Sequence, residues 1–555
     1  MTGWTLGVRL GGAVRVLGAD DPAVTTGGTG LGSGDGAGDG AGDGDLWIEV
    51  TAGPDGLELD HLVIRFAADV RPGDLAWLNG YQSWSQSEVR PLAARRAPLN
   101  RLGRVAQLHR MGDEAVAGRH RDRRAECSHE VLAVQREGRA RLWGSRVGHQ
   151  AFTVLEVAPD GLRAVVDVAG WRIGPGETAR IAWIEARTGD SAPELLRAWA
   201  GSLTSPRPAP SVTGWTSWYR YYGDIDAASL AGEIDALSAS DIQFDVFQID
   251  DGFQTHVGDW LTFAGGFPDG VAPLAAAARD RGMLPGLWLA PFVASRRSAL
   301  ALEHPDWLLR DARGRRVAAG WNGGWNGTFY ALDLENPAVL DHLATVFRTA
   351  RDEWGFGLLK LDFLYAAALD DRPGATRAQR MRRAVRLLRE WSGDAAILGC
   401  GVPLVSAAGL VEYCRIGADV AAKWEDRFLR ALSYRERVST VSSMRSTVAR
   451  AWMDGTWFAN DPDVVILRTE DSRLSDAERR ALFAVNTTFG SLVFVSDDIT
   501  AYDADTTSLL ASWGGSGAAR VVAHTQAGGV DSIRTGAGTV TVELGDRTGR
   551  VLTGG

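Results

Sequence analysis

The segment 358–363, with the sequence LLKLDF, places one lysine and one aspartate two residues apart in an apolar run. Residues two apart in a strand point to the same face of the sheet, so Lys360 and Asp362 are expected to lie side by side. Charged side chains in a buried strand are costly unless they pair or serve a site. The segment therefore predicts either a buried ion pair or a reactive carboxylate at the end of a strand.

Other acids follow apolar segments in the same way. Asp250 and Asp251 end one such segment, and Asp419 stands four residues after Arg415 at the end of another. Adjacent carboxylates at a strand end are good acceptors for hydroxyl groups; a turn in which an aspartate caps a helix is the alternative. For Arg415 and Asp419, the alternative is a surface salt bridge.

Two carboxyl groups on either side of a scissile bond are the usual requirement of glycoside hydrolysis. Asp362 is predicted as the nucleophile, because the nearby charge of Lys360 favours its ionised form. Asp419 is predicted as the acid, because partial burial and surrounding carboxylates favour its protonated form. The remaining candidates for binding a sugar ring and its hydroxyl groups are Arg415, Trp218, Trp288, Asp250 and Asp251.

These residues need an architecture that brings strand ends together. Between residues 211 and 512, apolar strands alternate with amphipathic helices, which is the pattern of βα units. Strands are predicted at 213–217, 246–250, 284–289, 358–362, 396–399, 411–416, near Trp457 and at 491–495, with helices at 226–238, 270–281, 337–354 and 376–392. About eight strands over about 300 residues predict a (β/α)₈ TIM barrel, in which active sites form at the carboxyl ends of the strands.

The regions on either side of the predicted barrel alternate apolar and polar residues with period two. Residues 1–203 are predicted to form an antiparallel β-sandwich, residues 211–512 the barrel, and residues 516–555 a small antiparallel β domain. The proline-rich stretch 205–211 is interpreted as a linker. The tract 26–45 is rich in glycine and aspartate but lacks the apolar residue of calcium-binding repeats, so a disordered hairpin loop is predicted.

Composition narrows the classes of partner. The 555 residues carry a formal net charge of −10, which argues against nucleic acid. We expect no signal peptide and no transmembrane helix, because no basic stretch near the start precedes a long apolar one. The three cysteines cannot form a disulfide framework, so a cytoplasmic location is predicted. The nine histidines are scattered without a HExxH motif, and neither a metal nor a cofactor is predicted.

Nine short motifs occur in order between about residues 75 and 500. They are NGYQSWS (79–85), GWTSW (214–218), FQIDDGF (247–253), GDW (258–260), PGLWLAPF (285–292), KLDF (360–363), CGVP (400–403), RIGAD (415–419) and NDPD (460–463). Each is weak alone, but the ordered set is specific. The chain resembles the family 36 glycoside hydrolases, the α-galactosidases related to melibiase.

This resemblance implies a β-supersandwich, a (β/α)₈ barrel and a C-terminal β-sheet. It implies a retaining exo-α-galactosidase acting on oligosaccharides of the melibiose or raffinose type, with Asp362 as nucleophile and Asp419 as acid/base. The residues that it implies for substrate binding are Asp250, Asp251, Lys360 and Arg415, with Trp84 reaching in from the first domain and Cys400 near the C2 side of the sugar. Ala418 stands where the family often has proline.

Other functions stay open at this point. An α-N-acetylgalactosaminidase or a galactosyl-transferring enzyme of the same family would share these motifs, and a non-catalytic sugar-binding protein would keep the barrel alone. The expected partner is an α-galactoside oligosaccharide, with no nucleic acid and no membrane. The length is that of the shorter members of the family and is compatible with a monomer, while the oligomeric state is left open.

Overall fold

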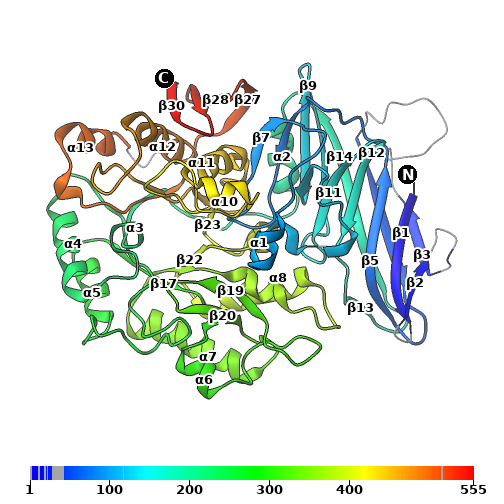
Figure 1. The fold of residues 1–555 in the computed structure, drawn as a ribbon, viewed down its shortest axis with the longest axis horizontal. Helices are drawn as coiled ribbons and strands as arrows, with labels where there is room; N and C mark the ends of the chain where they lie inside the picture. Colours follow the sequence, from blue (N-terminus) through cyan, green and yellow to red (C-terminus); the bar gives the residue numbers. More distant parts are fainter. Residues whose placement is uncertain are drawn as a thin grey trace.

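The computed structural model of the chain describes residues 3–10, 13–17, 21, 23–27, 43–116, 118–513 and 517–554. Figure 1 shows an N-terminal β-sandwich beside a central α/β barrel, with a small sheet at the C-terminal end. Within the described ranges, every helix is too short or too polar to cross a lipid bilayer.

The N-terminal part consists of two antiparallel sheets packed face to face. The first has the order β2-β1-β5-β12-β11-β8 with β13 beside β5, and the second has the order β3-β4-β14-β10-β9-β6-β7. Their bounds are β1 Gly3–Leu10, β2 Ala13–Leu17, β3 Val24–Gly27, β4 Gly44–Thr51, β5 Leu57–Phe66, β6 Leu75–Leu78, β7 Glu88–Pro91, β8 Cys127–His129, β9 Val131–Arg136, β10 Arg139–Ser145, β11 Thr153–Ala158, β12 Gly161–Val166, β13 Arg172–Ile173 and β14 Thr178–Gly189.

Period-two alternation explains this sandwich, because it gives each strand one apolar face for the shared core. Leu6 and Leu62 from the first sheet meet Ile48, Leu132 and Ile184 from the second, and all five are fully buried. The predicted sandwich is confirmed. Of the predicted hairpin loop 26–45, residues 28–42 lie outside the described residues.

The central part is a nine-stranded parallel sheet that curves into a barrel, in the order β24-β23-β22-β21-β17-β16-β15-β26-β25. The backbone N–H of Ser491, just before β26, donates to the carbonyl of Asn460 in β24 at 2.9 Å and closes the ring. The strands are β15 Val212–Thr216, β16 Val246–Ile249, β17 Leu284–Leu289, β21 Leu358–Leu361, β22 Ala396–Gly399, β23 Tyr413–Arg415, β24 Ala459–Asp461, β25 Val464–Val465 and β26 Leu492–Val495.

These strands are short apolar runs because both faces of a parallel barrel sheet are buried. The three leucines of β21, for example, are fully buried. Each of the eight predicted strands is present, and the predicted TIM-type barrel is confirmed. The strand β25 was not predicted, because two residues are too few to show an alternating pattern.

Helices cover the outside of the barrel, and several begin at caps that the sequence encodes. The Asp226 side chain accepts the Ser229 backbone N–H at the start of α4, and Thr376 forms a capping box with Gln379 at the start of α8. The bounds are α1 Arg101–Val105 and α2 Ala192–Gly201 in the N-terminal region, then α3 Trp218–Tyr221, α4 Ala227–Ala239, α5 Ala272–Asp280, α6 Ala299–Glu303, α7 Pro337–Arg348, α8 Arg377–Ser392, α9 Leu404–Ala407, α10 Arg427–Ala431, α11 Thr440–Ala449, α12 Asp476–Phe489 and α13 Ala504–Ala511. The helix predicted over 337–354 changes at Thr349 into a wider π-helical turn.

A small antiparallel sheet interrupts the barrel between β17 and β21. It has the order β18-β20-β19, with bounds β18 Val293–Ser295, β19 Ala318–Asn322 and β20 Gly327–Ala331. Sequence patterns missed it because the hairpin segment GWNGGWNG is mostly glycine, asparagine and tryptophan. This insertion lies near the carboxyl ends of the barrel strands and supplies part of the site described below.

The C-terminal part is a single antiparallel sheet in consecutive order, with bounds β27 Val521–Ala527, β28 Val530–Thr535, β29 Thr539–Leu544 and β30 Gly549–Gly554. One face packs on helices α11 and α12 of the barrel (Figure 1). Ile533 and Val542 are fully buried in one core with Met444 and Leu482. The predicted C-terminal β structure is therefore confirmed.

Candidate active site

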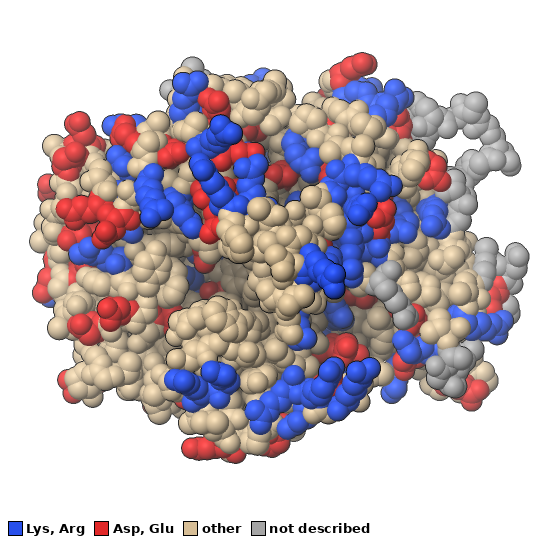
Figure 2. All heavy atoms as spheres, viewed as in Figure 1, with Lys and Arg blue, Asp and Glu red and all other residues tan. Residues whose placement is uncertain are grey.

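A cavity of about 240 Å³ opens at the carboxyl ends of the barrel strands. Figure 2 shows a hollow near the centre of this face of the molecule. Its walls are carboxylates, one lysine, aromatic rings and a few aliphatic side chains: Trp84, Met111, Trp218, Tyr219, Asp250, Asp251, Trp288, Trp321, Asn322, Trp325, Phe329, Lys360, Asp362, Phe363, Asp419, Leu429, Tyr434, Glu436 and Val438. Eight of the ten residues predicted for the site line it, while Arg415 and Cys400 lie outside the wall.

Lys360, on β21, forms an ion pair with a carboxylate that follows β16, two strands away in the barrel. Its Nζ lies 2.6 Å from Oδ2 of Asp250 at the end of β16, and both side chains are almost fully buried. Burial alone would favour the neutral amine, but the Asp250 carboxylate raises the pKa of Lys360 above its ordinary value. The pair therefore stays charged. The direct partner of Lys360 is thus Asp250, whereas Asp362 lies nearby on the same strand end.

The Asp362 carboxylate is fixed by two donors. Its Oδ1 accepts the backbone N–H of Phe363 at 2.8 Å, and its Oδ2 accepts Nε1–H of Trp288 at 3.1 Å. Phe363 has φ +54° and ψ +29°, a left-handed conformation that is uncommon for a residue with a large side chain. This turn directs the Phe363 N–H onto the carboxylate. Asp362 is therefore held rigidly at the cavity wall, as an attacking group requires.

Asp419 stands at the cavity in front of a buried charge network. Its Oδ1 lies 3.0 Å from Nη1 of Arg415, and the same guanidinium reaches Asp461 at 3.0 Å and Asp463 at 2.8 Å. Arg415 is only 2% exposed, so the alternative of a surface salt bridge is wrong. Asp461 and Asp463 engage the guanidinium from behind the wall and Asp419 engages it from the wall itself, and the predicted contact of Arg415 with a sugar hydroxyl stays a prediction.

The surroundings of Asp419 favour its protonated form. Burial and the negative charge of Asp463 raise its pKa to about 7, against the opposite effect of Arg415. Its side chain is nevertheless 37% exposed, toward the cavity that it lines. A carboxyl group that keeps a proton near neutral pH can donate it to a leaving group and later recover one from water.

Asp251 is held by two side-chain donors. Nε1–H of Trp325 donates to its Oδ2 at 2.6 Å, and Nε2 of Gln254 donates to its Oδ1 at 2.6 Å. Burial raises its pKa to about 6, and the charges of Asp250 and Asp362 act in the same direction. Asp250 and Asp251 therefore form a fixed pair of acceptors next to Lys360, rather than a helix cap.

Trp84 reaches the cavity from the N-terminal sandwich, as predicted. Its Nε1–H donates to Sγ of Cys400 at 3.2 Å, so Cys400 lies behind the indole and is 1% exposed. Gly401 has φ +58°, and a Cβ on it would lie 2.9 Å from the Trp84 ring. The loop that carries Trp84 is tied to the barrel by Arg450, whose guanidinium donates to the carbonyls of Gly80, Gln82, Ser83 and Ile416.

Sequence reasoning missed several residues of the wall. Trp321, Asn322, Trp325 and Phe329 come from the inserted sheet, where the repeated GWN at 320–322 and 324–326 was the available signal. The other missed residues are Met111, Tyr219, Phe363, Leu429, Tyr434, Glu436 and Val438. Glu436 accepts Ser85 Oγ–H at 2.7 Å and the Asp113 N–H at 3.0 Å. Burial, with the charge of Asp113, raises the pKa of Glu436 to about 7.

Residues 210–382, which carry most of these groups, match the family model described as melibiase. The predicted resemblance to the family 36 glycoside hydrolases is confirmed. The match begins just before β15 and ends within α8, so it covers the first half of the barrel. Asp250, Asp251, Lys360 and Asp362 lie inside it, whereas Asp419 lies beyond it.

Solved structures of an α-galactosidase from Thermus thermophilus resemble the chain over most of its length. The complex with p-nitrophenyl α-D-galactopyranoside is 29% identical, with TM-score 0.71, over 96% of this chain and 98% of that one. The complex of the same enzyme with stachyose has 29% identity and TM-score 0.70, over 88% of this chain and 99% of the other. This likeness extends through the sandwich, the barrel and the C-terminal sheet.

Curated relatives match over shorter stretches. A galactosaminidase of A-type blood α-D-galactosamine from Flavonifractor plautii is 30% identical over 27% of this chain and 14% of its own length. A probable α-galactosidase C from Aspergillus flavus is 28% identical over 29% of this chain and 22% of its own length. The aligned stretches thus span less than a quarter of either relative.

Proposed function

We propose that the protein is a retaining exo-α-galactosidase that removes terminal α-linked galactose from short oligosaccharides of the melibiose or raffinose type. The observation that carries the proposal is the pairing of two unlike carboxyl groups on one cavity. Asp362 is held by two hydrogen-bond donors, and Asp419 keeps a proton near neutral pH. The complexes of the Thermus thermophilus enzyme with galactosides support this substrate class.

In the proposed mechanism, Asp362 attacks the anomeric carbon while Asp419 protonates the glycosidic oxygen, and the leaving sugar departs. The galactosyl group is then bound to Asp362. Asp419, now ionised, removes a proton from water, whose oxygen attacks the anomeric carbon and releases Asp362. Asp250 and Asp251 accept hydrogen bonds from the sugar hydroxyl groups and Lys360 donates to them, while the tryptophans pack against the ring. The predicted cytoplasmic location stays a prediction.

An α-N-acetylgalactosaminidase is the second candidate, because the relative from Flavonifractor plautii is named for a galactose derivative with nitrogen at C2, α-D-galactosamine. Turnover of p-nitrophenyl α-galactoside, α-N-acetylgalactosaminide and α-glucoside separates the two. We expect the α-galactoside to have the highest kcat/KM. A higher kcat/KM on the N-acetylated substrate would make the second candidate the function, and no turnover of any of the three would contradict both.

The first sugar released should be α-galactose. Two displacements at the anomeric carbon restore its configuration, whereas a single attack by water would invert it. Proton NMR of the reaction in its first minutes, before the anomers equilibrate, distinguishes the two. Initial formation of β-galactose would contradict a covalent intermediate on Asp362.

Asp251→Asn should lower kcat/KM for p-nitrophenyl α-galactoside about 10²-fold more than for the α-glucoside. The axial 4-hydroxyl of galactose needs an acceptor where glucose offers no group, and a site built for a hydroxyl discriminates strongly. Asp333→Asn is the matched control, because that carboxylate pairs with Arg372 and does not line the cavity. An equal loss on both sugars would make Asp251 a structural residue.

A further inference from the structure

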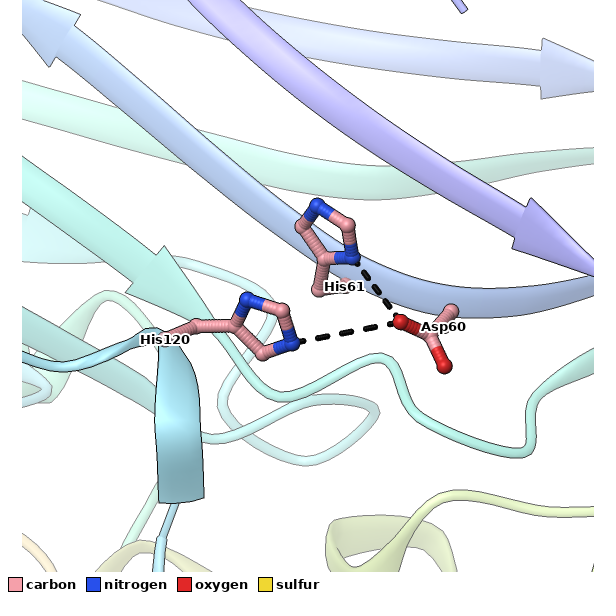
Figure 3. A group of neighbouring side chains, drawn as sticks. All are labelled: Asp60, His61 and His120. Carbon is pink, nitrogen blue, oxygen red and sulfur yellow. Dashed lines mark hydrogen bonds and ion pairs between the residues drawn. The ribbon is translucent and has the colours of Figure 1, made fainter. Parts of the chain in front are cut away.

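Three potential metal ligands converge on the N-terminal sandwich, outside the cavity described above. Asp60 and His61 lie on β5, and His120 lies on the 3-10 turn Gly118–His120 (Figure 3). Oδ2 of Asp60 is 2.9 Å from Nδ1 of His61 and 3.9 Å from Nε2 of His120. The two imidazole rings stack with their centroids 4.0 Å apart, and one ligand atom from each residue lies within 4.8 Å of the others.

A β-bulge gives consecutive residues of β5 a common direction. Neighbours in a strand normally point to opposite faces. Here Gly7 of β1 pairs with His61 while Val8 pairs with Leu59, so Asp60 is the extra residue of the bulge. Bulges re-aim side chains and are frequent beside functional sites. Gly7 is part of the arrangement, because a Cβ on it would lie 2.3 Å from the His61 ring.

The cluster faces a cavity of about 690 Å³ between the sandwich and the barrel. Asp60, His61, His120 and Asp167 line it from the sandwich side, while Asp371 and Arg372 are among its residues from the barrel. Asp167 is 7% exposed, and its Oδ2 has no hydrogen-bond partner within the part of the chain that the structure describes. A buried carboxylate oxygen without a partner is costly, and a bound water would supply one.

We propose that this cluster is a binding site for a first-row transition metal ion such as Zn²⁺. The ligands are Nδ1 of His61, Nε2 of His120 and Oδ2 of Asp60, and water would complete the coordination. Two imidazoles with a carboxylate form a usual zinc ligand set, whereas Ca²⁺ and Mg²⁺ take oxygen ligands. Ligands about 2.0 Å from a tetrahedral ion are about 3.3 Å apart, and the observed 2.9 and 3.9 Å lie on either side of that value.

The arginines around the cavity are engaged by other groups. Arg9 pairs with Oδ1 of Asp60, which turns Oδ2 toward the histidines. Arg372 binds Asp333 and Asp370, and Arg377 donates to the carbonyl of Ala115. A partner on the outer oxygen of a ligating carboxylate is a common arrangement in metal sites.

The ion would join β5 to a segment that reaches the candidate active site. His120 follows Met111, which lines the active-site cavity, and Asp113, whose N–H donates to Glu436. Because the ion would bind the folded chain and not the unfolded chain, it would also raise the free energy of unfolding. The inference does not depend on the galactosidase activity.

The test is a Zn²⁺ titration of the full chain after treatment with EDTA and desalting, in competition with a chromogenic chelator at pH 7.5. We expect one equivalent to bind with a Kd below about 1 μM, and Co²⁺ to give visible absorption bands of a tetrahedral site. His120→Ala and His61→Ala should each weaken binding at least tenfold. His304→Ala is the matched control, because this exposed histidine stacks on Trp307 outside the cluster and should leave binding unchanged.

Three outcomes would overturn the proposal. They are no binding by the unchanged chain at tens of micromolar Zn²⁺, equal binding after His120→Ala, and displacement of the ion by millimolar Ca²⁺ or Mg²⁺. Circular dichroism and the Tm without metal show whether a variant folds. If His61→Ala does not fold, His120→Ala and His120→Gln test the proposal, because His120 lies on a surface turn and its replacement should leave the fold intact.

Discussion

Asp362→Ala should lower the hydrolysis of p-nitrophenyl α-galactoside at least about 10³-fold and leave the chain folded. The substitution removes the attacking oxygen, which corresponds to a barrier increase of about 4 kcal/mol or more. The fold should survive, because the lost contacts are one backbone N–H and one indole N–H at the wall of a cavity that water can enter. Initial rates, with circular dichroism and Tm as checks on folding, measure both effects.

External azide should restore part of the activity of Asp362→Ala and yield β-galactosyl azide, because the anion attacks the anomeric carbon from the side of the missing carboxylate. Asp259→Asn is the matched control: its carboxylate accepts the N–H groups of Ala299 and Leu300 at the start of α6. That variant should lose about 1 kcal/mol of stability at most and keep its activity. More than about a tenth of the original rate in Asp362→Ala would contradict the assignment of the nucleophile.

The barrel was predictable because its strands are apolar runs with few competing patterns. The Lys360–Asp250 ion pair was not, although both residues were candidates. Period-two alternation says that Lys360 and Asp362 share a face, but it carries no information on which neighbouring strand supplies the counter-ion. That choice depends on the register between β16, β17 and β21, which sets the ends of three strands that are distant in sequence.

The sequence predicted why Asp419 keeps its proton, but it did not predict all the residues that surround this carboxyl group. Burial and surrounding carboxylates were the expected causes of its protonation, and Asp463 is the main charged contributor. Arg415 was expected to contact substrate, yet its guanidinium is engaged by three carboxylates and holds Asp419 in place. The motif 460–463 was noted in the sequence, but its contact with Arg415 arises only when β24 pairs with β23.

The inserted sheet was the part of the site least accessible to sequence patterns. Its strands are short and its hairpin is rich in glycine, so neither helical nor strand periodicity marks it. Trp325 nevertheless donates to Asp251, and Trp321 is 69% exposed at the rim of the cavity. Tryptophans placed by a loop, rather than by a periodic element, become visible as site residues only after the chain has folded.

Asp419→Ala should nearly abolish hydrolysis of melibiose, by about 10³-fold, while sparing the first step on activated aryl galactosides. A sugar leaving group needs a proton from the acid, whereas p-nitrophenolate leaves without one. The second step loses its base in both cases. Stopped-flow measurements on the aryl substrate should therefore show a burst of p-nitrophenol followed by slow turnover, because the galactosyl group accumulates on Asp362.

The pH dependence of the same pair of proteins tests the acid directly. The pKa of Asp419 is raised to about 7, and the proton-bearing form is the one that acts first. For the unchanged chain, kcat/KM on melibiose should thus fall as the pH rises through about 7, and this fall should be absent from the burst phase of Asp419→Ala. Azide should speed the slow phase and yield α-galactosyl azide, the anomer opposite to that from Asp362→Ala. Equal losses on aryl and natural substrates, with no burst and no effect of azide, would make Asp419 a binding residue. The proton donor would then be sought at Glu436, which lines the same cavity and whose pKa is raised to about 7 by burial.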